Sequence, residues 1–233
     1  MQFKEYRYLV LSDLYRIVGD VKLSALIRYV LIGDKYQYLF WMRTCQYARA
    51  NPLLRIWFYP IARVMLRRYS YKYGISIPFT TQIGSGLFIG HIGGIVVNPG
   101  CVIGKNCNLY HGASLLEGGL GDDLGWPTIG DNTFIGPGAK VLGPVRIGNS
   151  VLIVANSVVV RDVPDNAVVW GPLGRVISYE GSKHNILNTD YEERLRHKEL
   201  IDPDAIINNE TLYQRPTLGK TNPHSKDPGS KRK

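Results

Sequence analysis

An aliphatic side chain returns at every sixth position in the middle of the chain. The series has no exception over one stretch: Ile129, Ile135, Val141, Ile147, Ile153 and Val159. A period of six matches neither the 3.6 residues of an α-helix nor the two of a strand, but it is typical of a parallel β-helix whose triangular coil takes three hexapeptides. Four residues after each of these positions, the repeat has a small or β-branched residue: Thr133, Ala139, Val145, Val151, Ser157 and Val163. Such residues are expected where a second side chain points inward beside a tight corner.

The same period can be followed upstream in two shorter registers. The first is Ile77, Ile83, Ile89 and Ile95, and the second is Ile103, Leu109 and Leu115. Two extra residues separate Ile95 from Ile103, and eight extra residues separate Leu115 from Ile129, within a Gly-rich segment that carries Trp126. Insertions that leave the phase intact on either side predict loops that project from the coil.

The residues on either side of the hexapeptides have different patterns. Apolar positions recur at three- and four-residue spacing over residues 21–50, and Asn51-Pro52 marks a break before a second helical run that ends at Tyr73. After Val163 the hexads stop and the chain becomes polar, with one short helix expected over residues 190–200. We therefore expect a helical region over residues 1–74, a mainly β domain over residues 75–177, and a C-terminal extension over residues 178–233 whose end is disordered.

The formal net charge of +9 comes from the helical region, because residues 1–73 contain 13 Lys and Arg against 4 Asp and Glu. One interpretation is that the apolar side packs on the β domain and on neighbouring subunits while the arginines are solvated. The other is contact with an anionic membrane surface, which basic amphipathic helices favour. No nucleic-acid-binding motif accompanies the charge, so nucleic acid is not an expected partner.

Two features indicate the compartment. The three cysteines are odd in number and are not arranged as a disulfide framework. The apolar run near the N-terminus is four residues long between charges, too short for the core of a signal peptide. We expect a cytoplasmic protein, which the membrane interpretation would place at the inner face of the membrane.

Two histidines occupy the same place in their hexapeptides. His91 follows Ile89 by two residues, His111 follows Leu109 by two, and their separation less the two inserted residues is one full coil. The two imidazoles are therefore predicted to stack on one face, with backbones about 4.8 Å apart. Pro137 and then Ala155 continue the column. This arrangement suits a base beside a track for a slender cofactor arm, although a single exposed histidine is often a bystander.

Several segments together resemble a known family. The hexads, with GLFIGHIGGIVVNPGCVIG, GPGAKVLGPVRIGNSVLIVANSVVVRDVP and the ending WGPLGRVIS, resemble the hexapeptide-repeat acyltransferases, and within them the serine O-acetyltransferase-like branch. That branch includes enzymes that acetylate the sugars of capsules and exopolysaccharides. The resemblance implies a left-handed parallel β-helix, a homotrimer with sites between adjacent subunits, and acetyl transfer from acetyl-CoA to a hydroxyl.

The resemblance also implies roles for particular residues. His91 matches the catalytic histidine, while His111 is either a second catalytic group, an acceptor ligand or a spacer. Contacts with the CoA arm are implied for Pro137, Gly138, Ala139 and Ala155, and a contact with a CoA phosphate for Arg175. No resident metal is expected, because a metal-dependent hydratase of the same fold would need three histidine ligands.

The acceptor is inferred from departures from the family pattern. True serine acetyltransferases carry Asp-Arg-His-Pro where this chain has Leu124-Gly125-Trp126-Pro127, and Gly90 replaces the aspartate that usually precedes the catalytic histidine. An indole suits the apolar face of a sugar ring, so the main hypothesis is O-acetylation of a cell-surface polysaccharide sugar or its precursor. The alternatives are serine O-acetylation in cysteine biosynthesis and a scaffold without catalysis.

Two acceptor-site candidates have structural alternatives. Trp126 either contacts the acceptor or anchors its own loop. Asp13 resembles the N-terminal acceptor-site aspartate of the branch, but it is equally explained as a charge near a helix N-terminus.

Overall fold

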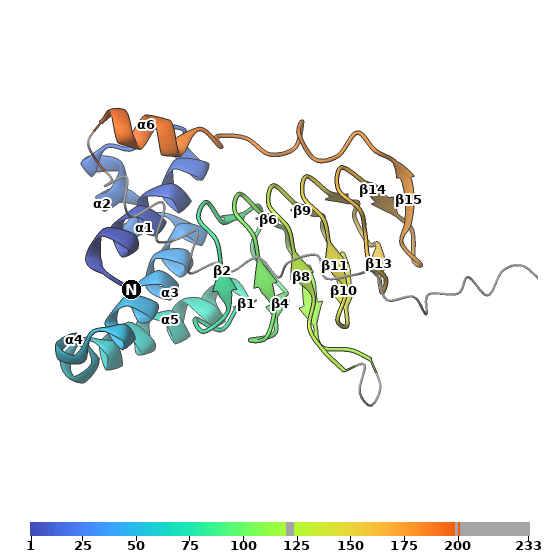
Figure 1. Cartoon of the computed structure of the whole chain (residues 1–233). Coiled ribbons are helices and arrows are strands. Elements are labelled where there is room, and N and C mark those ends of the chain that lie inside the picture. The colour runs from blue at the N-terminus through green and yellow to red at the C-terminus, as the bar shows by residue number, and fades with distance from the viewer. Residues whose placement is uncertain (120–123, 199, 201–233) are drawn as a thin grey trace, which may run out of the picture.

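A computed structural model describes residues 1–119, 124–198 and 200. The chain before residue 74 is helical, and these helices gather at one end of a long β-helix (Figure 1). Their bounds are α1 (Phe3–Val18), α2 (Leu23–Ile32), α3 (Asp34–Ala50), α4 (Pro52–Trp57) and α5 (Tyr59–Tyr73). α3 contacts both α1 and α5 and forms the centre of this helical region.

Two helix breaks differ from the expectation. The run over residues 21–50 divides at Gly33, where a Cβ atom would lie 2.6 Å from the Tyr29 carbonyl oxygen. The second run divides at Phe58, and Pro60 stands in the first turn of α5. Apolar spacing continues across both breaks, so periodicity alone did not reveal them.

The β domain winds through three sheets, one for each side of a triangular coil, and their strands are parallel except for β15, which pairs antiparallel with β14. The first sheet contains β1 (Ile75–Ser76), β4 (Ile95–Val97), β7 (Ser114–Leu116), β10 (Lys140–Leu142) and β13 (Val158–Val159). The second contains β2 (Gln82–Ile83), β5 (Val102–Ile103), β8 (Thr128–Ile129) and β11 (Arg146–Ile147). The third contains β3 (Phe88–Ile89), β6 (Asn108–Leu109), β9 (Phe134–Ile135), β12 (Leu152–Ile153), β14 (Val168–Trp170) and β15 (Arg175–Ser178). The left-handed parallel β-helix expected from the hexads is confirmed.

The aliphatic position of each hexapeptide points into the coil. All six residues of the unbroken series, from Ile129 to Val159, are at most 3% exposed. Strand pairing places equivalent positions above one another, as when Ile89 pairs with Leu109 and Leu109 pairs with Ile135. The stacked aliphatic side chains form a single continuous core, which stabilises the coil by removing apolar surface from water.

The two-residue insertion lies in a different turn from the one expected. Ile89 pairs with Leu109 and Val97 pairs with Leu115, so the turn from Ile89 to Val97 is two residues longer than its neighbour. Ile95 is buried because it occupies the second inward position, where it pairs with Ile75. The sequence alone could not show whether Ile95 or Val97 continues the series of aliphatic positions, because both residues are apolar. The longer turn is the one that carries His91.

The C-terminal extension runs back along the outside of the coils. Residues 179–190, which we call the C-terminal strap, lead from β15 to α6 (Tyr191–His197) beside α1 (Figure 1). Ser182 donates its backbone N–H to Ser150 at 3.0 Å, and the Tyr191 hydroxyl lies 2.8 Å from that of Ser85. The strap therefore ties the last coil to the helical region. The segment expected to be disordered at the end of the chain lies outside the described residues.

Candidate active site

His91 and His111 lie in successive coils, in the turns that follow β3 and β6. Their ring centroids are 5.8 Å apart, with the rings inclined at 66°. Both side chains are exposed. The two histidines therefore lie one above the other on one face of the coil, as the hexapeptide phase predicts. The pairing of Ile89 with Leu109 fixes both turns at the same corner.

The column beyond the histidines consists of small or compact residues. The Gly138 N–H donates to the His111 carbonyl at 2.9 Å, and the Asn156 N–H donates to the Pro137 carbonyl at 2.8 Å. These bonds place Pro137 one coil beyond His111 and Ala155 one coil further. At the usual strand spacing, the column from His91 to Ala155 is about 14 Å long. A smooth track therefore begins at the imidazoles and runs along one edge of the β-helix.

One aromatic ring, that of Tyr110, lies beside His91. The Tyr110 ring centroid lies 5.7 Å from that of His91, edge to face, and 4.8 Å from that of Phe134. Lys35 of α3 donates from its ammonium group to the Gly90 carbonyl, and its Nζ lies 5.0 Å from the Phe88 ring centroid. Burial lowers the pKa of Lys35. The environment of His91 is thus aromatic, with one lysine close to its backbone.

Gly90 is required by the position of Tyr110. A Cβ atom at residue 90 would lie 2.3 Å from the Tyr110 ring, far inside van der Waals contact. Tyr110 therefore occupies the space into which a side chain at position 90 would extend. In this chain the tyrosine ring takes the place of the aspartate that usually precedes the histidine.

Carboxylates do not contact the imidazole pair within the described parts of the chain. The ion pairs found there involve other groups, and the histidine among them is His197. The same residues contain no cluster of three or more His, Cys, Asp or Glu side chains placed to hold a metal ion. The chemistry available at this corner is that of two exposed imidazoles.

The expected CoA-binding residues are spread along the column. Gly138 has a φ of +69°, and a Cβ there would meet the Asn156 side chain at 2.1 Å. Ala139 is 0% exposed and belongs to the interior of the coil, so its methyl group is not available to a cofactor. Small residues mark the second inward position as well as a smooth surface, and the expected contact of Ala139 with the CoA arm stays a prediction. Arg175 is exposed and pairs across from Trp170 at the last coil.

Trp126 lies at another corner of the coil from the histidines. The strand β7 leads away from the His111 turn to the segment that contains Trp126. The indole covers Gly100, where an added Cβ would lie 2.3 Å from the ring, and it is 44% exposed. Within one chain the structure does not bring Trp126 to the mouth of the His91 site. The ring anchors the base of its loop, where Gly118 and Gly125 pair through backbone hydrogen bonds of 3.0 Å.

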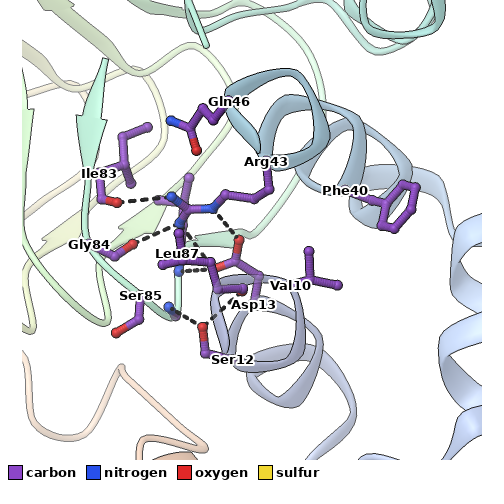
Figure 2. A network of polar contacts seen from close by, with 12 residues as sticks. Val10, Ser12, Asp13, Phe40, Arg43, Gln46, Ile83, Gly84, Ser85 and Leu87 are labelled. Atoms are coloured by element: carbon purple, nitrogen blue, oxygen red, sulfur yellow. Dashed lines mark hydrogen bonds and ion pairs between the residues drawn. The ribbon is translucent and has the colours of Figure 1, made fainter. Parts of the chain in front are cut away.

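Asp13 is buried in the junction between the helical region and the first coil (Figure 2). Its carboxylate accepts from Arg43 Nε at 2.9 Å and from the Leu87 N–H at 2.8 Å. Arg43 also donates to the carbonyls of Ile83 and Gly84, at 2.9 and 2.7 Å. The side chains of Asp13 and Arg43 are 1% and 0% exposed. The Asp13 oxygens face protein donors, so in the single chain they are not open to an acceptor.

Two residues of the site were not expected from the sequence. Tyr110 could have been found, since it lies one coil above Gly90 in the same hexapeptide register. Lys35 has no sequence signal, because it reaches Gly90 across 55 residues through the packing of α3 on the coil.

Comparisons with known proteins agree with the fold. Residues 127–161 match the bacterial transferase hexapeptide family (six repeats). Serine acetyltransferase from Bacillus subtilis is 38% identical over 158 residues, which cover 67% of this chain and 69% of that protein. The Bacillus pumilus enzyme of the same name is 39% identical over 147 residues, which cover 62% of this chain and 64% of that protein. This chain therefore spans just under two thirds of the length of the B. pumilus relative.

Solved structures show the same fold. Serine acetyltransferase from Brucella abortus in complex with coenzyme A superposes with a TM-score of 0.62 and 28% identity, covering 76% of this chain and 69% of that one. The Neisseria gonorrhoeae enzyme in complex with serine gives a TM-score of 0.60 and 29% identity, covering 76% of this chain and 70% of that one. The fold, the hexads and these identities agree: the chain belongs to the hexapeptide-repeat acyltransferases, in their serine O-acetyltransferase-like branch.

Proposed function

We propose that this protein transfers an acetyl group from acetyl-CoA to a hydroxyl, with His91 as the general base. The observation that carries the proposal is the exposed His91–His111 pair at the head of a smooth column. A neutral imidazole takes the proton from the acceptor hydroxyl as its oxygen attacks the thioester carbonyl. The tetrahedral intermediate then expels the CoA thiolate, which takes the proton from His91. An O-acetyl ester and free CoA result, with no redox change.

The column supplies a binding track for the CoA arm. Pro137 and Ala155 present compact side chains along it, so an extended arm can lie flat with its thioester near the imidazoles. Arg175 is exposed at the last coil, where its guanidinium can pair with a phosphate of the nucleotide end. Gly138 contributes by its lack of a side chain rather than through its N–H, which is bonded to His111.

Serine is the acceptor that the relatives favour. The similar proteins are named serine acetyltransferases, and one solved structure contains serine. The comparisons do not support polysaccharide O-acetylation, the main hypothesis from the sequence, and they agree better with its alternative. We therefore propose L-serine as the first acceptor to test.

A sugar hydroxyl is kept as a second candidate because of a specific observation at the site. Tyr110 fills the space beside Gly90, and the described residues place no carboxylate against the imidazoles that could hold an ammonium group. Gly125 and Trp126 also replace the arginine and histidine that would hold an amino-acid carboxylate. An aromatic wall suits the apolar face of a sugar ring better than it suits a zwitterion.

We further propose that the working form is a homotrimer. His91 and His111 are exposed in the single chain, whereas thioester chemistry benefits from a site that excludes water. A neighbouring β-helix against this edge would supply the missing wall. Sedimentation should then give three times the chain mass of 26.2 kDa.

The base assignment can be tested by substitution. His91→Ala should lower kcat/KM about 10²- to 10⁴-fold with either acceptor, because the proton acceptor is lost. Release of CoA from acetyl-CoA is the measurement, with His184→Ala, an exposed histidine of the strap, as the matched control. Undiminished turnover in His91→Ala would remove His91 from the mechanism. Comparing kcat/KM for L-serine with that for candidate sugars decides the acceptor separately.

A further inference from the structure

The outer side of the α4–α5 hairpin is apolar and exposed. In α4, Leu53, Ile56 and Trp57 share one face of the helix, and they are 80%, 68% and 81% exposed. In α5, Ile61 and Val64 continue the pattern, and they are 54% and 67% exposed. We call these five residues, together with the arginines between and beside them, the α4–α5 surface. More than half of each of the five apolar residues is exposed.

The same surface is strongly basic. Its arginines are Arg55, Arg63, Arg67 and Arg68, all exposed. No Asp or Glu occurs anywhere between Asp34 and Glu117 in the sequence. Ion pairs with carboxylates are not found for these arginines among the described residues; Arg63 and Arg67 instead lie over the rings of Phe79 and Tyr71, at 4.8 and 5.6 Å. Positive charge is therefore left available to an outside partner.

We propose that the α4–α5 surface docks on an anionic membrane. Apolar side chains with an exposed indole would enter the boundary between headgroups and acyl chains, and the arginines would meet anionic lipid phosphates. The mode is peripheral, because among the described residues no helix is both long and apolar enough to cross a bilayer. The proposal is independent of the acetyl acceptor: α4 follows the C-terminal end of α3, whereas Lys35 lies at its N-terminal end.

Charge also argues against a two-fold contact between two copies of the chain through this surface. A two-fold contact would bring the same patch of both copies together, and this patch has four arginines and no carboxylate to pair with them. An anionic lipid surface supplies the opposite charge at every position. The favourable partner is therefore acidic and extended, as a lipid headgroup layer is.

The chain provides a matched control surface on α2. Leu31 and Ile32 are 67% and 70% exposed, close to the values for Val64 and Ile56. α2 has a single basic residue, Arg28, over its ten residues. Apolar exposure is thus alike on the two surfaces, while positive charge is concentrated on one of them.

The test is sedimentation of the full chain with vesicles of phosphatidylcholine containing one-third phosphatidylglycerol. At low ionic strength the wild-type protein should bind these vesicles and largely ignore pure phosphatidylcholine, and about 0.5 M salt should release it. Arg55→Gln with Arg68→Gln should weaken binding about 25-fold, or about fivefold for each charge removed. Ile56→Glu with Trp57→Glu should weaken it at least as much. Leu31→Glu with Ile32→Glu should bind as the wild type does.

Three results would overturn the proposal. The wild type could fail to bind anionic vesicles at low salt, or the α2 pair could weaken binding as much as the α4 pair. Alternatively, sedimentation velocity without lipid could show self-association that Ile56→Glu with Trp57→Glu abolishes, which would assign the surface to a second copy. CoA release, measured in solution for each variant, should stay at the wild-type rate and separates these results from a failure of the proposed reaction.

Discussion

The protein contains two polar clusters that differ in almost every physical respect. The Asp13–Arg43 pair is buried, and its charged groups are hydrogen-bonded to one another and to backbone groups of the first coil. The His91–His111 pair is exposed, and its imidazoles contact aromatic rings rather than charged partners. The first cluster is complete within the chain, whereas the second is open to a ligand.

This difference separates a structural role from a chemical one. Burying two charges is costly unless each is paired and hydrogen-bonded, so a satisfied buried pair indicates a junction that must keep its geometry. An exposed pair of imidazoles contributes little to stability and is accessible to a ligand. The resemblance to a family of acetyltransferases implied a catalytic role for His91 and an acceptor-binding role for Asp13, but burial distinguishes the two clusters.

The largest expected effect on stability comes from breaking the buried pair. Asp13→Ala should lower the free energy of unfolding by about 3–5 kcal/mol, because Arg43 is left buried without its counter-charge. Urea denaturation measures the change. Asp13→Leu with Arg43→Met should recover much of it, since it removes both charges. His91→Ala is the matched control, and a comparable loss in that variant would contradict the separation of roles.

A smaller effect on stability is expected at Gly90, which directly precedes His91. Gly90→Asp should lower the free energy of unfolding by about 1–3 kcal/mol, because its Cβ would overlap the Tyr110 ring. Adding Tyr110→Ala makes room and should restore part of the loss. The same double variant sharpens the acceptor question: a lower KM for L-serine is expected if an aspartate at position 90 can hold its ammonium group. No rescue of stability would mean that the overlap with Tyr110 is not the constraint.

The last prediction concerns the reactivity of the three cysteines, all of which are free and buried, and it involves no change in stability. Burial raises the pKa of Cys45 and of Cys107 to about 12, and that of Cys101 to about 11. At pH 8 the thiolate fraction of Cys107 should be about a thousandfold below that of an unperturbed thiol. Reaction with dithiobis(nitrobenzoate) should therefore be slow in the native protein and fast in denaturant. Rapid native reaction of one thiol would show local opening of its coil.

Much of the β domain could be predicted, because a hexapeptide period fixes both the inward face and the stacking register. The alignment of His91 above His111 follows from that register, as does the position of Pro137 and Ala155. The location of the two-residue insertion could not be found, since Ile95 and Val97 both satisfy an apolar pattern. Ala139 shows a related ambiguity, because small side chains suit both the inner corner and an outer track.

The sequence by itself determined the coil, its core and the column that begins at the two imidazoles, because these depend on spacing along a repeating segment. Only the tertiary structure decided the place of Asp13, which meets Leu87 across 74 residues, and that of Trp126, which covers Gly100 at another corner. Lys35 beside Gly90 also came from packing, whereas Tyr110 above Gly90 follows from the hexapeptide register. The physical reason is that a period encodes contacts between successive coils, whereas the seating of helices and loops on the coil depends on shapes and charges that no local pattern records.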